Sequence, residues 1–270
     1  MPSLANHQSN EFTKLLLIGD SGSGKTGALT PLVCGGYKPR ILDMDNGLET
    51  LKTFVHKQCP AALENVEFRT LRDEYKATAL GPEVVKPTAF VAAIKMLDRW
   101  KYDDVDLGVP AEWGPDCILV VDSLTFLSDA AFAWAVGLSP SAKDPRQWYG
   151  TAQNAVENVL ALLTSPNFKT NVIVTAHVKY IENPDGTKKG YPTSVGSALS
   201  PTIPRYFNSV ALCQTKVGGK RTIQTVATAM IDLKNPKPFE MAKEYDLTNG
   251  LGEFFGVLRN PPKPQLKRVK

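Results

Sequence analysis

The residues best suited to chemistry lie near the start of the chain, in the segment Gly19-Asp20-Ser21-Gly22-Ser23-Gly24-Lys25-Thr26. Its three glycines let backbone N–H groups turn inward around phosphate groups, Lys25 can reach the outer phosphates, and the Thr26 hydroxyl can ligate Mg²⁺. The apolar run 15–18 comes directly before it and predicts a strand, which is the context that a phosphate-binding loop requires. The sequence therefore predicts a nucleotide-binding protein.

Carboxylates near the ends of two predicted strands are placed to act on the phosphates that such a loop binds. Asp122 ends the apolar run 117–121, so we expect its side chain at the carboxyl edge of a buried strand, where it would hold Mg²⁺. The alternative is that Asp122 caps the following helix. Ser123 comes next where many ring-forming ATPases have Glu, so a base that activates water must come from another strand. Asp43 and Asp45 are the obvious sources, and Asp45 lies closer to the strand end.

Composition limits what kind of protein this is. The 270 residues are 43% hydrophobic, which suits one α/β domain with embellishments or a domain plus a small appendage. No run approaches 18 apolar residues and the polar start lacks the build of a signal peptide, so we expect a soluble, intracellular protein without membrane contact. The four cysteines form no CxxC pair, so neither a zinc site nor a disulfide framework is indicated. They are Cys34, Cys59, Cys117 and Cys213.

The elements that must position these residues can be read from hydrophobic patterns. Strands are predicted at 15–18, 40–45, 66–71, 117–123, 171–176, 209–215 and 221–228. Helices are predicted at 26–34, 88–100 and 151–163, and polar loops at 137–149 and 178–204. Strands that alternate with helices predict a mainly parallel central sheet with helices on both faces, and the last two strands predict a C-terminal antiparallel hairpin.

Charge is unevenly distributed along the chain. Residues 176–270 carry 15 Lys and Arg side chains against 7 Asp and Glu, whereas residues 1–175 carry 16 against 20. Such asymmetry is typical of a protein with an anionic partner, although solvated surface lysines would give the same count. We expect an N-terminal arm at 1–13, too short for a separate DNA-binding domain, a core at 14–258 and a basic tail at 259–270.

The chain resembles the RecA-type recombinase core, and in particular the short RecA-like ATPases of bacteriophages that are associated with single-strand annealing. The matching segments are GDSGSGKT at 19–26, ILDMDNGLETL at 41–51, ILVVDSLTFL at 118–127 and VIVTAHV at 172–178, which occur in the family's order. The resemblance implies a RecA-like P-loop NTPase fold and assigns Asp45 the orientation of the attacking water. The family normally has Glu there, so the side chain of this Asp is one methylene shorter than the family's residue.

The same resemblance assigns roles after the last parallel strand. His177 stands where the family has a polar residue, usually Gln, that senses the γ-phosphate. The loops 137–149 and 178–204 correspond to the family's two DNA-binding loops, and the alternative is that they are ordinary surface loops. Lys234 resembles lysines that reach the nucleotide site of a neighbouring subunit. The residues implied in DNA contact are Arg146, Trp148, Lys179, Lys188, Lys189, Tyr191 and Arg205.

Taken together, the sequence predicts an ATP- and Mg²⁺-dependent ATPase that is stimulated by single-stranded DNA and promotes annealing or recombination. We expect a homo-oligomer, ring or filament, in the cytoplasm of the host if the protein is phage-encoded, and a single-stranded-DNA-binding protein as a further partner. Lys25 is part of the predicted catalytic set with Asp45 and His177. Two alternatives stay open, an ATP-gated DNA- or protein-binding switch with negligible turnover and a phosphotransferase that acts on a small molecule.

Overall fold

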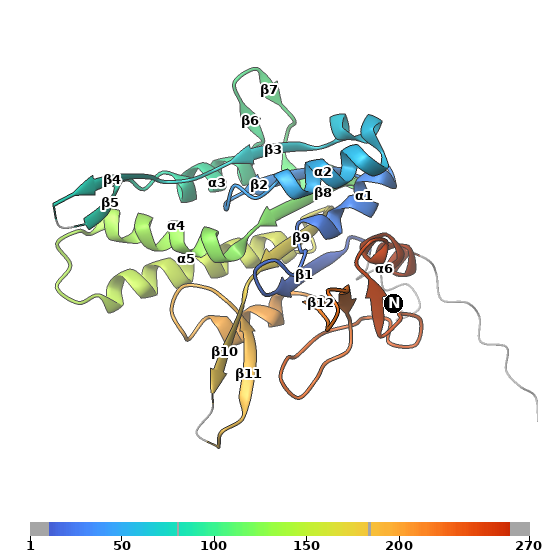
Figure 1. Ribbon diagram of the computed structural model, residues 1–270. Coiled ribbons are helices and arrows are strands. Elements are labelled where there is room, and N and C mark those ends of the chain that lie inside the picture. The colour runs from blue at the N-terminus through green and yellow to red at the C-terminus, as the bar shows by residue number, and fades with distance from the viewer. Residues whose placement is uncertain (1–10, 80, 183–184, 260–270) are drawn as a thin grey trace, which may run out of the picture.

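An eight-stranded sheet forms the centre of the computed structural model, which describes residues 11–79, 81–182 and 185–259 (Figure 1). The strand order is β14-β13-β12-β1-β9-β8-β2-β3. Neighbours from β12 to β3 run parallel, whereas β13 and β14 add an antiparallel edge. The strands of this sheet are β1 Lys14–Gly19, β2 Lys38–Asp43, β3 Glu67–Thr70, β8 Gly114–Asp122, β9 Thr170–Ala176, β12 Ser209–Thr215, β13 Arg221–Gln224 and β14 Glu244–Asp246.

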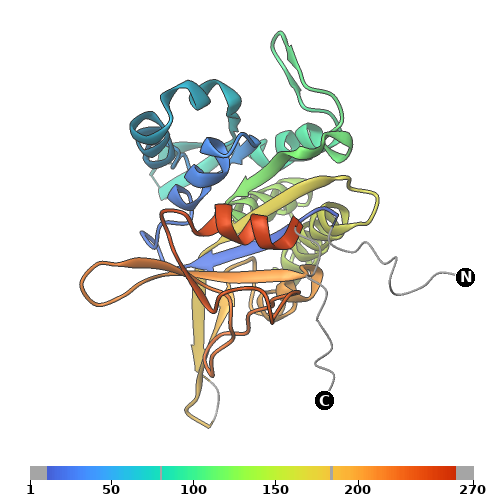
Figure 2. The same ribbon diagram turned by 90° about the vertical axis from the view of Figure 1, so that its right-hand side faces the viewer.

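Helices cover both faces of the sheet (Figures 1 and 2). One core joins Leu16 and Ile18 of β1 to α3, α4 and α5, and the other joins Leu15 and Leu17 to α1, α2 and α6. Successive strand residues point to opposite faces, so the continuous apolar run of β1 is buried on both. The helices are α1 Thr30–Cys34, α2 Glu49–Gln58, α3 Ala89–Asp98, α4 Leu124–Leu138, α5 Arg146–Thr164 and α6 Gly250–Arg259.

The predicted parallel sheet, its helices on both faces and the C-terminal hairpin are all present, with some boundaries shifted. The predicted helix 26–34 is a 3-10 turn, Gly27–Leu29, followed by α1. Pro31 occupies the first turn of α1, where a missing backbone N–H removes no helical hydrogen bond. The strand predicted at 40–45 ends at Asp43, so Asp45 lies just beyond β2 rather than within it.

Both predicted polar loops are partly regular structure, which corrects the sequence-based prediction. In the first, α4 ends at Leu138 and α5 begins at Arg146, so only 139–145 connect them. The second contains an antiparallel hairpin, β10 Val178–Glu182 and β11 Lys188–Pro192, and a 3-10 segment, Ser200–Tyr206. Cross-strand pairing and packing determine the secondary structure of these segments, and neither produces a clear periodic pattern in a polar sequence.

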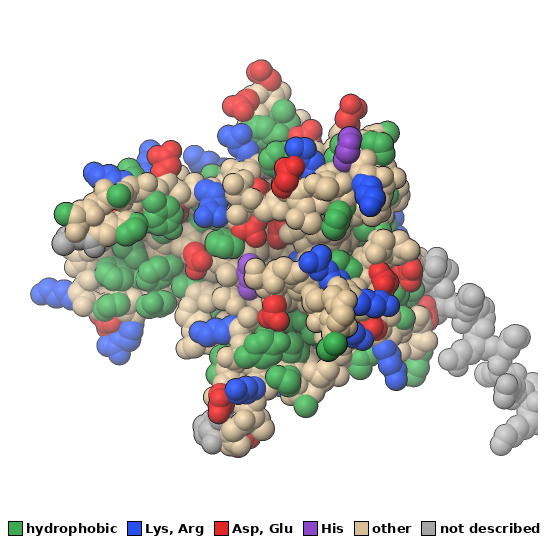
Figure 3. Space-filling view, viewed as in Figure 1, with side chains coloured by type: hydrophobic (Ala, Val, Ile, Leu, Met, Phe, Trp, Pro, Cys, Tyr) green, Lys and Arg blue, Asp and Glu red, His purple; other side chains and the backbone are tan. Residues whose placement is uncertain are grey.

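Two further hairpins were not predicted from the sequence, nor were the last two elements of the chain, β14 and α6. Strands β4 Glu74–Thr78 and β5 Gly81–Lys86 pair beside α4, and the short strands β6 Lys101–Tyr102 and β7 Val105–Asp106 form a second hairpin. Apolar side chains gather where β4, β5, α4 and α5 meet (Figure 3). They line a groove of about 700 Å³ whose aromatic members are Tyr75, Phe132 and Tyr149.

A disulfide joins Cys34 and Cys59, which corrects the expectation drawn from cysteine spacing. Their Cα atoms lie 5.7 Å apart although 25 residues separate them in the sequence. The reason is that α1 and α2 pack side by side on one face of the sheet, which brings the C-terminal ends of both helices together. Cys117 and Cys213 carry free thiols.

Reduction of this disulfide is expected to lower the free energy of unfolding by about 3.5 kcal/mol, because closing a loop of this length restricts the unfolded chain. For a chain of this size the loss corresponds to a fall of roughly 7 °C in Tm. Thermal unfolding followed by circular dichroism with and without a phosphine reductant measures it. The Cys34→Ser variant should show the lower Tm in both conditions, and an unchanged wild-type Tm on reduction would contradict the prediction.

Among the described residues, no helix has the length and apolar content needed to cross a bilayer. The structure does not describe residues 1–10 and 260–270. The predicted N-terminal arm at 1–13 and the predicted basic tail at 259–270 therefore lie largely outside the described residues. Arg259 belongs to α6 rather than to the tail.

Candidate functional site

The predicted phosphate loop connects the carboxyl end of β1 to the 3-10 turn before α1. Gly24 adopts a φ of +97°, a conformation that L side chains rarely take. A Cβ atom on Gly24 would also stand 2.6 Å from a methyl group of Leu247. Glycine is therefore required here both by the backbone and by the close approach of the segment after β14.

Lys25 lies in the floor of the loop with only 7% of its surface exposed. Its Nζ atom donates to the carbonyl oxygens of Gly19 and Asp20, at 2.9 and 3.0 Å. Burial lowers the pKa of this ammonium group, and the nearby carboxylates of Asp122 and Asp45 oppose that shift. The Lys25 ammonium group is therefore held beside the loop in a poorly hydrated place, where a phosphate oxygen would be a strong partner.

Asp122 ends β8 as predicted and is 1% exposed. Its Oδ2 atom accepts a hydrogen bond from Thr26 Oγ1 at 2.8 Å, and its Oδ1 atom accepts one from Thr175 Oγ1 at 2.5 Å. Burial raises the pKa of Asp122, whereas these hydroxyl donors lower it. The peptide bond to Ser123 is cis. The alternative role as a side-chain cap is not seen, because Ser123 is the N-cap residue of α4 and no side-chain capping bond is present there.

The oxygen atoms of Thr26 and Asp122 are the kind of ligand that Mg²⁺ prefers, and Mg²⁺ bound with a nucleotide takes its remaining ligands from water and phosphates. The Thr26–Asp122 hydrogen bond puts the two donor oxygens side by side next to the phosphate loop. The residues present therefore fit Mg²⁺. Thr175 was not predicted, and its only signal is a hydroxyl within the apolar run of β9.

The two candidate carboxylates after β2 have different surroundings. Asp43 accepts hydrogen bonds from Thr70 Oγ1 at 2.8 Å and from the backbone N–H of Gly47 at 3.2 Å. Among the described residues, the buried Oδ1 atom of Asp45 has no hydrogen-bond partner. Asp43 is thus occupied in holding the turn, and the geometry favours Asp45 as the carboxylate available to a ligand.

The pKa of the Asp45 carboxyl group is raised. Burial, together with the neighbouring charges of Asp122 and Asp43 and a side-chain interaction with Asp43, raises the pKa of Asp45 to about 6, against the lowering effect of Lys25. A carboxylate with such a pKa is a stronger proton acceptor than an ordinary exposed Asp and is still mostly ionised at neutral pH.

His177 follows β9 at the same edge of the sheet. Its backbone N–H donates to Thr125 Oγ1 at 3.1 Å, and its ring stands edge-on to Phe126 at 6.1 Å. Burial and the nearby Lys25 ammonium group lower the pKa of His177, so its imidazole is neutral at physiological pH. A neutral ring can donate one hydrogen bond to a phosphate oxygen.

These side chains line one cavity of about 220 Å³, so the structure brings together the predicted phosphate loop, base, metal ligand and sensor. The cavity also contains Arg221 at the start of β13, which the sequence analysis missed because the residue lies far along the chain within an ordinary strand pattern. Its lining residues are Ser21, Gly22, Gly24, Lys25, Thr26, Gly27, Asp45, Thr50, Asp122, His177 and Arg221.

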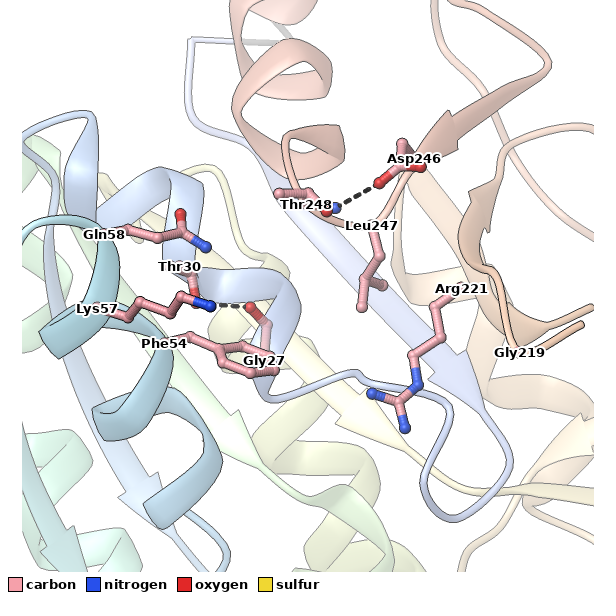
Figure 4. A pocket seen from close by; sticks show the side chains of 10 residues that line it. All are labelled: Gly27, Thr30, Phe54, Lys57, Gln58, Gly219, Arg221, Asp246, Leu247 and Thr248. Atoms are coloured by element: carbon pink, nitrogen blue, oxygen red, sulfur yellow. Dashed lines mark hydrogen bonds between the residues drawn. The ribbon is translucent and has the colours of Figure 1, made fainter.

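A second, larger pocket of about 440 Å³ adjoins the first, with Gly27 and Arg221 lining both. Figure 4 shows Phe54, Lys57 and Gln58 of α2 on one side of it, and Arg221 and the segment Asp246 to Thr248 on the other. The Phe54 ring packs close to Gly27, since a Cβ atom on this glycine would lie 2.9 Å from the ring. The phosphate loop thus opens onto a pocket with an aromatic wall.

The residues predicted to contact DNA lie outside both pockets, in two places. Arg146 and Trp148 lie in the first turn of α5, whereas Lys179, Lys188, Lys189 and Tyr191 lie on the β10–β11 hairpin with Arg205 in the 3-10 segment that follows. Several of the cations already have acidic partners. These ion pairs are Arg146–Asp144 at 2.7 Å, Lys188–Glu182 at 3.5 Å, Lys189–Asp232 at 2.7 Å and Arg205–Glu157 at 2.9 Å.

Trp148, an aromatic residue of the first predicted DNA-binding loop, makes a hydrogen bond within the chain: its Nε1 atom donates to the carbonyl oxygen of Ser139 at 2.8 Å. Lys234 is likewise held within its own chain, since its Nζ atom donates to the carbonyl oxygens of Pro204 and Phe207 at 2.6 and 3.2 Å. The predicted action of Lys234 on a neighbouring subunit stays a prediction.

The sheet order and the phosphate loop define a P-loop NTPase. The family model described as an AAA domain matches residues 11–236, and the chain belongs to this family. The predicted fold class is confirmed as an α/β P-loop NTPase with a mainly parallel central sheet, helices on both faces and a C-terminal antiparallel hairpin. The finer resemblance to phage annealing ATPases stays a prediction.

Solved structures with a similar fold include the RadB recombinase, at 17% sequence identity and a TM-score of 0.43, with 78% of this chain and 79% of that chain covered. Another is an ATPase from the type III secretion system of pathogenic bacteria, at 17% identity and a TM-score of 0.45. That alignment covers 76% of this chain and 52% of the ATPase. A search of curated proteins found no match.

Proposed function

We propose that this protein is an Mg²⁺-dependent ATPase whose nucleotide cycle controls the binding of single-stranded DNA. The observation that carries the ATPase proposal is the single cavity in which Lys25, Asp45 and Asp122 meet at the phosphate loop. Each of these residues comes from a different part of the chain, and the residue types match what phosphoryl transfer to water requires.

In this mechanism the loop N–H groups and the Lys25 ammonium group bind the phosphates, and Thr26 and Asp122 would hold Mg²⁺. When bound, the metal ion would supply positive charge that offsets the charge on the phosphate oxygens. Asp45 orients the attacking water and accepts its proton. Its buried Oδ1 atom makes no hydrogen bond among the described residues, and the pKa of its carboxyl group is raised to about 6.

The larger pocket beside the loop suits the base and sugar of the nucleotide. The Phe54 ring offers a stacking surface, and the amide of Gln58 offers both a donor and an acceptor at the pocket wall. We assign adenine as the base on the family resemblance. Competition of GTP, CTP and UTP with a fluorescent ATP analogue measures this preference.

The link to DNA is proposed through His177, whose backbone is hydrogen-bonded to residues of two neighbouring segments. Its N–H donates to Thr125 at the start of α4, and its carbonyl accepts from Thr193 N–H at 2.7 Å, just beyond β11. Thr125 Oγ1 also donates to the Thr193 carbonyl at 3.3 Å. A shift of His177 on loss of the γ-phosphate would therefore move the base of the β10–β11 hairpin.

We assign single-stranded DNA to this hairpin, with annealing or strand exchange by a homo-oligomer as the biological role. Lys179 and Tyr180 are exposed on β10, the lysine suited to a phosphate and the tyrosine to stacking on a base. The acidic partners of Lys188, Lys189 and Arg205 reduce the net positive charge that the surface offers, so the binding should be moderate and steeply weakened by salt.

Phosphate release, titrated with single-stranded DNA at several salt concentrations, tests this proposal. Turnover that needs Mg²⁺ and rises with DNA at low salt is the expected result. DNA binding that depends on ATP without phosphate release would favour the alternative of a gated switch. Turnover that requires a small phosphate acceptor, with no DNA binding at low salt, would favour a phosphotransferase and overturn the DNA assignment.

A further inference from the structure

The strongest unassigned feature of the site is the Arg221 side chain. It extends from β13 toward the phosphate loop, across from the side chains of α2 (Figure 4). The Cδ atom of Arg221 lies 3.2 Å from the position that a Cβ atom on Gly24 would take. The chain's own arginine therefore stands directly against its own phosphate loop.

Hydrogen bonds hold the backbone of Arg221 in place, whereas its guanidinium group is available to bind an anion. Its backbone pairs with Thr215 in the β12–β13 ladder, and its carbonyl accepts a hydrogen bond from Leu247 N–H at 3.1 Å. Two lysines of the same hairpin are engaged by acids, Lys216 with Glu244 at 2.5 Å and Lys220 with Asp246 at 3.5 Å. Among the described residues, no acid pairs with Arg221.

The place of Arg221 along a bound nucleotide follows from the two pockets. The outer phosphate of the nucleotide would lie in the smaller pocket. Only this pocket is lined by Lys25, Asp45, Asp122 and His177. Phe54 lines only the larger pocket, where the base and sugar would lie. Arg221 and Gly27 line both, so the guanidinium group stands at the junction, which a nucleotide would fill with its α- and β-phosphates.

We propose that Arg221 is a nucleotide-binding residue that acts in its own subunit and clamps the α- and β-phosphates against the phosphate loop. This inference rests on the proposed function. A guanidinium group can give two parallel hydrogen bonds to phosphate oxygens. Because ATP and ADP share these phosphates, the clamp strengthens the binding of both and adds little to the chemical step.

Titrations with fluorescent ATP and ADP analogues test the clamp in Arg221→Ala, with Arg221→Lys as the conservative variant. Loss of a charge-assisted pair should weaken both nucleotides by about tenfold, equally within a factor of two. The lysine variant keeps the charge but loses the fork, so it should recover part of the affinity. In phosphate release, KM should rise for Arg221→Ala while kcat changes by less than about threefold.

The matched control is Lys216→Ala, which removes a cation of the same hairpin that pairs with Glu244, and neither of these residues lines either pocket. It should leave both affinities within about twofold of the wild-type values. Weaker ATP with unchanged ADP binding would place Arg221 on the γ-phosphate and overturn the proposal, as would unchanged affinity for both. Loss of binding in Lys25→Ala alongside an unaffected Arg221→Ala would reject the clamp while leaving the nucleotide site itself intact.

Mixing the Lys25→Ala and Arg221→Ala variants tests whether Arg221 acts on the nucleotide of its own subunit. If Arg221 served a neighbour, subunits carrying Lys25→Ala would donate their intact arginine to subunits carrying Arg221→Ala. We expect instead that, at subsaturating ATP, the mixture shows only the sum of its components' separate activities. Activity above that sum would show action between subunits and overturn the assignment.

Discussion

Replacement of Lys25 by alanine is expected to reduce ATP turnover by at least about 100-fold and to weaken ATP binding strongly. The Lys25 ammonium group is nearly buried and held by two loop carbonyl oxygens, so its removal leaves the phosphates without their central positive charge. Phosphate release and titration with a fluorescent ATP analogue measure the two effects.

A suitable control for this change is Lys38→Ala, because Lys38 is an exposed lysine at the amino end of β2, whereas the phosphate loop follows the carboxyl end of the parallel strand β1. It should keep wild-type turnover. The Tm of Lys25→Ala, measured in the same buffer, shows whether the variant is folded. Full hydrolysis by a folded Lys25→Ala protein would contradict the assignment of the phosphate loop as the nucleotide site.

Much of this site could be predicted from the sequence because its residues lie at the ends of buried strands. The apolar runs before Gly19 and Asp122 identify strands, and parallel strands present their carboxyl ends at one edge of the sheet. The convergence of Lys25, Asp45 and His177 follows from that rule once the strands are placed.

The residues that sequence reasoning missed are those whose position depends on pairing between distant segments. Arg221 reaches the phosphate loop only because β13 pairs with β12, which in turn pairs with β1. The disulfide forms because α1 and α2 pack together, and the sequence spacing of Cys34 and Cys59 does not indicate this packing. Thr175 is one hydroxyl in an apolar strand, a pattern that occurs in many strands without any function.

The second large effect is expected at Asp45, where asparagine should reduce turnover by about 1,000-fold while ATP binding is retained. An amide keeps the shape of the side chain but cannot accept the proton of water. The wild-type kcat/KM should also depend on pH. With a pKa of about 6, Asp45 is protonated below that pH, so kcat/KM should be half-maximal near pH 6 and fall about tenfold per unit at lower pH.

A neighbouring substitution shows whether that pH dependence belongs to Asp45. Asp43 is one of the charges that raise the pKa of Asp45, yet its own side chain is engaged by Thr70 and Gly47. Asp43→Asn removes the charge and keeps an oxygen acceptor, so the midpoint of the kcat/KM profile should move to lower pH while kcat at pH 8 changes little. A profile whose midpoint is the same in both proteins would show that another group controls turnover, and Asp45 would then lose its assignment as the base.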